Sequence, residues 1–112
     1  MKEFVLIFRM TKDDQPSPAQ MQERMKLWQD WMGGIAAQNK LASSGNRLGT
    51  EGKVVKPKNV VTNGPYVEIK ETIGGYIIIK AETIDEAAEI SKGCPILQGG
   101  GNVEVRPIVS ME

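Results

Sequence analysis

The chain has 112 residues and a formal net charge of zero, because 14 Lys and Arg residues balance 14 Asp and Glu residues. This length fits one domain, and a neutral chain lacks the positive field that attracts nucleic acid or anionic membranes, so we expect neither as a partner. The sequence contains no histidine, which excludes imidazole bases, Ser/His or Cys/His nucleophiles and nitrogen-ligand metal sites. Oxygen-ligand metal sites stay open, but we interpret Asp13-Asp14 and Asp85-Glu86 as solvated surface, so we expect no metal and no cofactor.

The cysteine count also bears on location. One cysteine cannot form an internal disulfide, and no signal-peptide pattern opens the chain, so we expect a cytoplasmic protein. The longest apolar runs, FVLIF and YIII, are too short to cross a bilayer.

Residues 3–10, EFVLIFRM, carry apolar side chains at both alternating sets of positions, which predicts a strand buried on both faces. A helix is then predicted near residues 18–39, with Ser17 as N-cap, Pro18 in the first turn and Gln20 completing a capping box. Apolar residues recur along it at steps of three and four, at Met21, Met25, Trp28, Met32, Ile35 and Ala36. We interpret this stripe as core, and a ligand groove is the alternative that methionine leaves open.

Two glycines, Gly33 and Gly34, interrupt this predicted helix. Each costs about 1 kcal/mol relative to alanine, so either the helix breaks there or its backbone closely approaches another element, and we expect the close approach. Residues 41–60 are rich in Gly, Ser and Lys and predict one exposed strand with its turns. Asn63-Gly64 then predicts a tight turn with positive φ.

Residues 73–79 are again apolar at both sets of positions and predict a second strand buried on both faces. A short helix near residues 83–92 follows, predicted from a capping box and from a Gly and a Pro after its end, at Thr83, Glu86, Gly93 and Pro95. Alternating Val103 and Val105 predict the last strand, which Pro107 ends.

This order predicts an α+β fold, the ferredoxin-like βαββαβ sandwich, with both helices on one face of a four-stranded antiparallel sheet. Strands apolar on both faces imply that the face away from the helices is also buried, although no third helix is predicted to cover it. We therefore expect a homodimer formed through the sheet faces that carry residues 3–10 and 73–80.

The segment NGPYVEIKE, residues 63–71, resembles the DGPFAETKE signature of the YCII-related family. Five residues match the signature: Gly64, Pro65, Glu68, Lys70 and Glu71. Tyr66 stands in place of its Phe, and Asn63, Val67 and Ile69 depart from it. The segments IGGYIIIKAETIDEAAEISKGCP and GGNVEVRPI also look like the family's strand, helix and last strand. The resemblance covers nearly the whole chain and implies one domain, residues 1–112, in a dimeric α+β barrel.

The resemblance also bears on chemistry. Relatives are proposed to use a His and Asp pair in a cleft, but this chain has no histidine and carries Asn63 in place of the signature's Asp. An amide cannot shuttle a proton, so family-type acid–base chemistry is expected to be weak or absent.

The charged part of this segment supplies the candidate site. An extended backbone would place Tyr66, Glu68 and Lys70 on one side, either as a solvated strand surface or as the wall of a cleft in which burial shifts a pKa. These three are the catalytic candidates. The candidate ligand-binding residues are the same three with Asn63, Arg9 and Arg106, where the arginines either clamp an anion or reach solvent.

Two further features carry weaker expectations. The glycines at residues 99–101 resemble a phosphate loop in composition only, because a strand and not a helix follows them. Cys94 is expected to be a small buried hydrophobic residue.

Two functions follow from the sequence. The first is a homodimeric small-molecule-binding or regulatory protein with a cleft at the sheet and dimer interface, which the missing His and Asp favour. The alternative is a cofactor-independent enzyme with lyase-like or isomerase-like acid–base chemistry on a small polar or aromatic compound. Neither hypothesis identifies the ligand or substrate.

Overall fold

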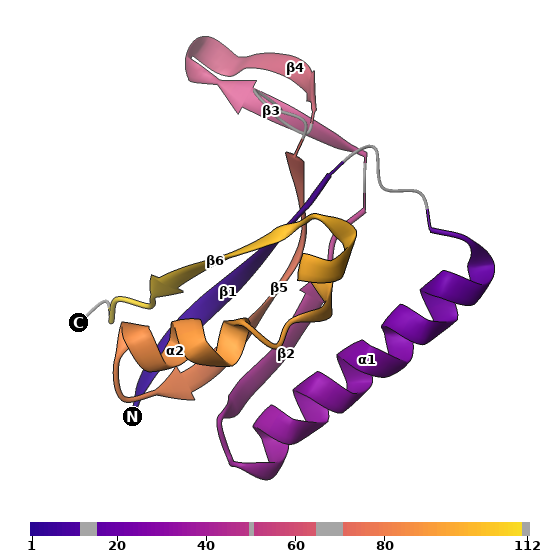
Figure 1. The fold of residues 1–112 in the computed structure, drawn as a ribbon. Helices are drawn as coiled ribbons and strands as arrows, with labels where there is room; N and C mark the ends of the chain where they lie inside the picture. The colour runs from indigo at the N-terminus through magenta and orange to yellow at the C-terminus, as the bar shows by residue number, and fades with distance from the viewer. Residues whose placement is uncertain (12–15, 50, 65–70, 111–112) are drawn as a thin grey trace.

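The computed structural model describes residues 1–11, 16–49, 51–64 and 71–110 (Figure 1). Its elements, in chain order, are β1 (Lys2–Thr11), α1 (Pro18–Ala37), β2 (Leu41–Arg47), β3 (Gly52–Lys56), the short 3-10 helix η1 (Pro57–Asn59), β4 (Val60–Gly64), β5 (Glu71–Ala81), α2 (Ile84–Ser91), the 3-10 helix η2 (Pro95–Gly99) and β6 (Asn102–Pro107).

The fold is α+β and consistent with a ferredoxin-like sandwich. Four antiparallel strands form one sheet in the order β2-β5-β1-β6, and β3 and β4 pair separately as a hairpin between β2 and β5. With that hairpin set aside, the remaining elements run βαββαβ, as the sequence predicts. Both helices lie on the same side of the sheet (Figure 1).

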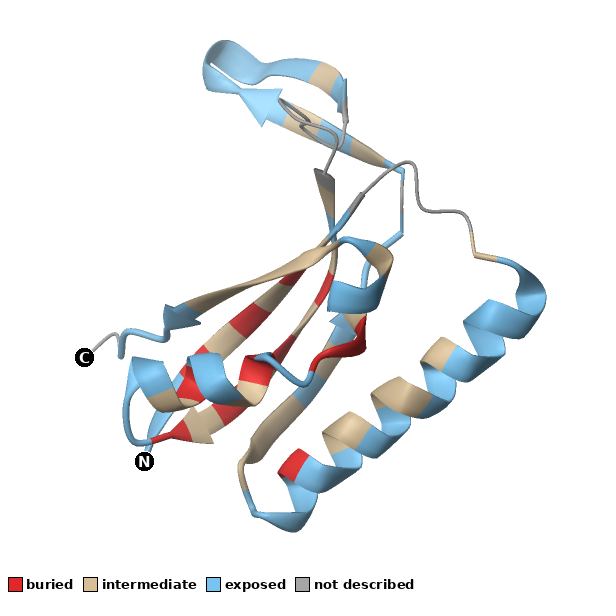
Figure 2. Cartoon of the chain, viewed as in Figure 1, coloured by how far each residue is buried: buried red, intermediate tan, exposed pale blue. Residues whose placement is uncertain are grey.

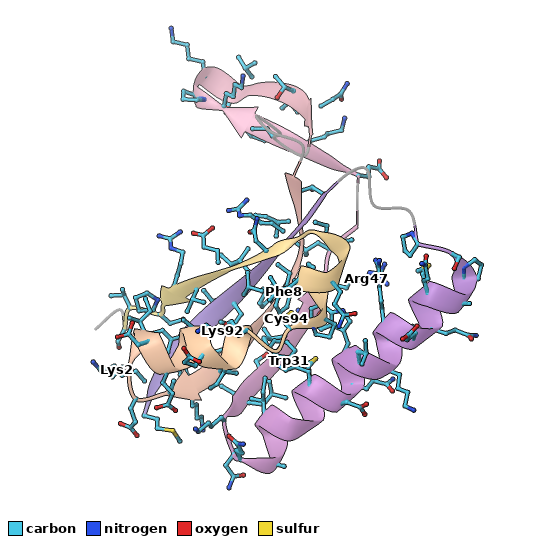
Figure 3. All side chains as sticks on the ribbon, in the orientation of Figure 1. Lys2, Phe8, Trp31, Arg47, Lys92 and Cys94 are labelled. Atoms are coloured by element: carbon cyan, nitrogen blue, oxygen red, sulfur yellow. The ribbon has the colours of Figure 1, made fainter. Side chains whose placement is uncertain are left out.

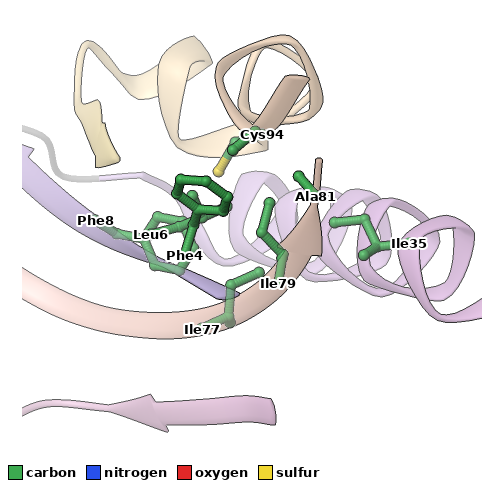
Figure 4. Close-up of a cluster of buried hydrophobic side chains, with 9 residues drawn as sticks. Phe4, Leu6, Phe8, Ile35, Ile77, Ile79, Ala81 and Cys94 are labelled. Atoms are coloured by element: carbon green, nitrogen blue, oxygen red, sulfur yellow. The ribbon is translucent and has the colours of Figure 1, made fainter. Parts of the chain in front are cut away.

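The hydrophobic core lies between the sheet and the helices. Its buried members come mainly from the two central strands, β1 and β5, and are Phe4, Leu6, Phe8, Ile77, Ile79 and Ala81, joined by Ile35, Ala87 and Cys94 (Figures 2 and 4). The alternate residues Val5, Ile7 and Ile78 are only half-buried. Within one protomer the described elements cover only one face of these strands, so the predicted burial of the other face by a second copy stays a prediction.

The start of α1 follows the predicted signals. The Ser17 side chain accepts a hydrogen bond from the Gln20 backbone N–H at 3.2 Å, and the Gln20 side chain accepts one from the Ser17 backbone N–H at 2.9 Å. The helix runs without a break through Gly33 and Gly34 to Ala37. A Cβ atom added at either glycine would meet nothing within 4 Å, so the predicted close approach is wrong; these glycines face solvent.

The segment after α1 differs from the prediction. It forms two strands, β2 and β3, and Asn63 lies in a third strand, β4, opposite Lys53. The chain reverses instead at Lys58 and Asn59, whose φ angles are 68° and 62°. Pro57 begins this turn, and asparagine tolerates a left-handed backbone conformation. The turn therefore forms five residues before the predicted position. Figure 1 shows this hairpin projecting from the sheet, away from α2.

Helix α2 begins as predicted but with half of the capping box. Thr83 accepts a hydrogen bond from the Glu86 backbone N–H at 3.1 Å. The Glu86 carboxylate instead binds Lys40 at 2.9 Å, and this interaction lowers the pKa of the Glu86 carboxyl. Glu86 thereby ties α2 to the chain segment between α1 and β2.

Candidate ligand-binding site

A cavity of about 340 Å³ lies between α1, the sheet and η2. It is lined by Phe8, Met10, Pro16, Met21, Arg24, Met25, Trp28, Met32, Ser44, Asn46, Arg47, Gly74, Gly75, Tyr76, Ile77, Pro95, Ile96, Gly99 and Gly101. The lining comes from both sides of the gap, with one wall from α1 and the other from β1, β2 and β5.

The apolar stripe of α1 forms one wall of this cavity. Ile35 is the only residue of the helix that is buried; Trp28 and Met32 are half-buried, and Met21 and Met25 are 45% and 56% exposed. The core interpretation of the stripe is therefore correct for its C-terminal end and wrong for its N-terminal half. That half diverges from the sheet (Figure 1), and its methionines line the cavity.

Phe8 and Trp28, which line the cavity, belong to an aromatic cluster. The rings of Phe8 and Trp28 meet edge to face with centroids 4.8 Å apart, and Trp31 lies 5.6 Å from Trp28. The Trp31 indole N–H donates a hydrogen bond to the Ile90 carbonyl at 3.1 Å, which joins α1 to α2. These contacts hold Trp28 in place, so its ring is a preformed part of the cavity wall.

A bulge in β2 sets the opposite wall. Gly45 has a φ of 62°, and the pairing of β2 with β5 shifts register between Ser43 and Asn46. After the bulge, Arg47 pairs with Gly75, which itself pairs with Phe8 of β1. Since Phe8 faces the helices, Arg47 also starts on the helix side of the sheet, and Figure 3 shows it between the sheet and α1.

The charge of the described cavity lining is positive. Arg24 of α1 and Arg47 of β2 contribute guanidinium groups, and none of the described lining residues is an Asp or Glu. Across the described part of the chain, the Arg47 guanidinium makes no hydrogen bond or ion pair. The cavity therefore combines apolar walls with one guanidinium group on each of its two walls.

The structure describes three of the six predicted site residues, Asn63, Arg9 and Arg106. Tyr66, Glu68 and Lys70 fall outside the described residues. Asn63 lies in β4, where its side-chain oxygen accepts a hydrogen bond from the Lys53 ammonium at 3.3 Å.

Arg9 and Arg106 come together around one carboxylate. The Arg9 guanidinium donates to Glu104 at 2.8 Å, and Arg106 lies 3.9 Å from the same side chain. Glu104 pairs with Ile7, so this group lies on the sheet face away from the helices, and neither arginine lines the cavity. Glu104 opposes part of their positive charge, and the anion clamp stays a prediction.

The sequence interpretation missed both cavity arginines. Arg24 was detectable, because it lies three residues after Met21 and four before Trp28 and so shares the face of the apolar stripe. No sequence signal places Arg47 in the cavity, because the face of the sheet on which its side chain lies depends on the bulge at Gly45.

The glycines at residues 99–101 do not form a phosphate loop at a helix start. Gly100, with a φ of 83°, ends η2, and β6 follows from Asn102. Gly99 and Gly101 line the cavity next to Ile96.

Cys94 is 2% exposed within the core, as expected, and burial raises the pKa of its thiol to about 11 (Figure 4). We expect the folded protein to react with a thiol reagent at pH 8 at least about a hundredfold more slowly than the unfolded chain, because the reactive thiolate is scarce and shielded. Absorbance of the released thiol, followed with and without denaturant, measures both rates. Equal rates would contradict the burial of Cys94.

The described residues contain no helix long and apolar enough to cross a membrane. Within the same residues, no cluster of three or more His, Cys, Asp or Glu side chains is placed to hold a metal ion. Comparison with curated proteins finds none that matches the chain. The family model of the YCII-related domain matches residues 4–112, which is essentially the whole chain, and the chain therefore belongs to the YCII-related domain family.

Proposed function

We propose that this protein is a homodimer that binds a small molecule in the cavity between α1 and the sheet. The observation that carries the proposal is the exposed N-terminal half of the α1 stripe, where Met21 and Met25 face the cavity instead of the core. Exposed apolar surface costs about 25 cal/mol per Å², so covering it with a ligand would supply binding free energy. The cavity volume of about 340 Å³ falls within the usual range of ligand pockets.

The dimeric part of the proposal rests on the sheet face away from the helices. Val5, Ile7 and Ile78 leave its centre apolar and half-exposed, and the charges of Arg9 and Glu104 beside them are already paired. A second copy packed sheet to sheet would bury this surface. Tyr66, Glu68 and Lys70 remain the predicted wall of a cleft at that interface, which is the rival location for a ligand.

We propose binding without catalysis. None of the described residues that line the cavity supplies a carboxylate or an imidazole, the groups that most often act as general bases. The described lining instead offers cationic, apolar and hydroxyl groups, which are suited to holding a molecule.

A fragment screen on two matched variants tests the proposal. We expect small aromatic fragments to change the tryptophan fluorescence of the native protein and to bind about tenfold more weakly to Met25→Lys, because the substitution places a hydrated charge on the cavity wall. Val55→Lys is the control, since Val55 is 69% exposed on the β3–β4 hairpin and lies outside the cavity. Ligand-observed NMR gives the affinities.

Two outcomes would contradict the proposed site. The absence of any bound fragment would remove the binding function, and binding that is unchanged in Met25→Lys would place the ligand elsewhere. Light scattering on the same samples tests the assembly, and a monodisperse monomer at micromolar concentration would contradict the dimer.

A further inference from the structure

Arg47 stands at the edge of the cavity with its hydrogen-bonding capacity unused by the described residues. Its guanidinium carries five N–H donors in a planar fork. No acceptor for any of these donors occurs in the described part of the chain, although Arg9 on the opposite sheet face has Glu104. Its strand partner on β5 is Gly75, which has no side chain, and both residues line the cavity.

A second cation lines the same cavity from the other side. Arg24 projects from α1 on the stripe that contains Met21 and Trp28. Arg24 already takes part in an interaction within the protein, whereas the Arg47 guanidinium has no partner in the described part of the chain and the described lining contains no acidic side chain. Because apolar walls lower the effective dielectric constant, the unpaired Arg47 cation favours an anionic group on the ligand.

The remaining walls are suited to an apolar body. Met25 and Met32 supply polarizable thioethers, and the Trp28 ring is held in position by its edge-to-face contact with Phe8. Methionine sulfur and aromatic rings contact each other favourably, so this surface favours a flat aromatic group. A sugar phosphate or a nucleotide would leave many polar groups without partners on such walls.

We infer that the ligand is a small organic anion with an aromatic body, and that Arg47 binds its carboxylate. This inference rests on the proposed function, because it names the ligand class of the same cavity. The planar fork of arginine matches a carboxylate with two parallel hydrogen bonds, which gives a carboxylate an advantage over a neutral amide of the same shape.

The test compares isosteric pairs of probes, trans-cinnamate with trans-cinnamamide and 2-naphthoate with 2-naphthamide, by calorimetry and ligand-observed NMR at neutral pH. We expect the native protein to bind each acid about tenfold or more tightly than its amide. In Arg47→Gln we expect the affinity for the acid to fall to that of the amide. Arg106→Gln is the matched control on the other sheet face and is expected to keep the preference, and thermal melts verify that both variants are folded.

The outcomes separate this inference from the proposed function. Equal binding of acid and amide by the native protein would overturn the inference and leave the binding function standing, since the cavity would still be occupied. A preference for the acid that survives in Arg47→Gln, or that disappears in Arg106→Gln, would also overturn it. If neither acids nor amides bind, the inference is overturned, and the fragment screen then decides separately whether the cavity binds any ligand.

Discussion

Replacing Gly45 with alanine is expected to lower the free energy of unfolding by about 3 kcal/mol or more. The φ of Gly45 is 62°, a region that costs an alanine about 1 kcal/mol or more. An added Cβ atom would also overlap the Tyr76 carbonyl oxygen, which belongs to the neighbouring strand β5. Backbone must therefore move, and the β2 bulge that places Arg47 beside the cavity would move with it.

The glycines of α1 provide the control, with the opposite sign. Gly33→Ala and Gly34→Ala introduce a Cβ atom that meets nothing within 4 Å, in a helical backbone that alanine prefers. Each is expected to raise the free energy of unfolding by about 0.5 to 1 kcal/mol. Urea denaturation followed by circular dichroism measures all three variants, and a Gly45→Ala protein as stable as the native one would contradict the described bulge.

The elements with strong local signals could be predicted from the sequence. The start of α1 follows from Ser17, Pro18 and Gln20, whose interactions span only one turn of the chain. The two central strands follow from dense apolar runs, and the helix between residues 84 and 91 follows from its N-cap and from Gly93 after its end. Such signals act within a few residues, so the sequence is sufficient to identify them.

The position of the β3–β4 hairpin could not be predicted from the sequence. Asn59 and Asn63 each belong to a sequence that could form a turn, and local chemistry does not distinguish the two positions. The pairing of Val55 with Val61 and of Lys53 with Asn63 settles the reversal at Lys58 and Asn59. Strand pairing is a non-local interaction, which single-sequence patterns do not contain.

The candidate site could not be predicted from the sequence either. Helical periodicity shows that Met21, Met25 and Trp28 share a face, but it does not show what that face contacts. The distance between α1 and the sheet depends on how the helix is oriented by its C-terminal contacts, where Ile35 and the Trp31 hydrogen bond hold it. The cavity follows from that orientation, and so does the position of Arg24 within it.

Replacing Leu6 with alanine is expected to lower the free energy of unfolding by about 3 to 4 kcal/mol. Leu6 is 0% exposed in the central strand β1, and its strand partners are Ile77 and Val105. Truncation removes the favourable transfer free energy of the lost carbon atoms and leaves a cavity. Because β1 is paired with β5 on one side and with β6 on the other, its backbone cannot move to close that cavity. Urea denaturation measures the loss, and a cost below about 1 kcal/mol would contradict the assignment of the core to the helix side of β1.

The adjacent residue makes this measurement informative about assembly. Ile7 points to the other sheet face and is half-buried in the protomer, so Ile7→Ala is expected to cost about 1 kcal/mol if that face meets water. In the proposed homodimer the second sheet would cover Ile7, so its truncation would cost more, and the loss would depend on protein concentration, because dissociation is then linked to unfolding. Denaturation of Leu6→Ala and Ile7→Ala at low and high protein concentration separates the two cases. A small cost at Ile7 that does not change with concentration would contradict the sheet-to-sheet dimer, whatever the cost at Leu6.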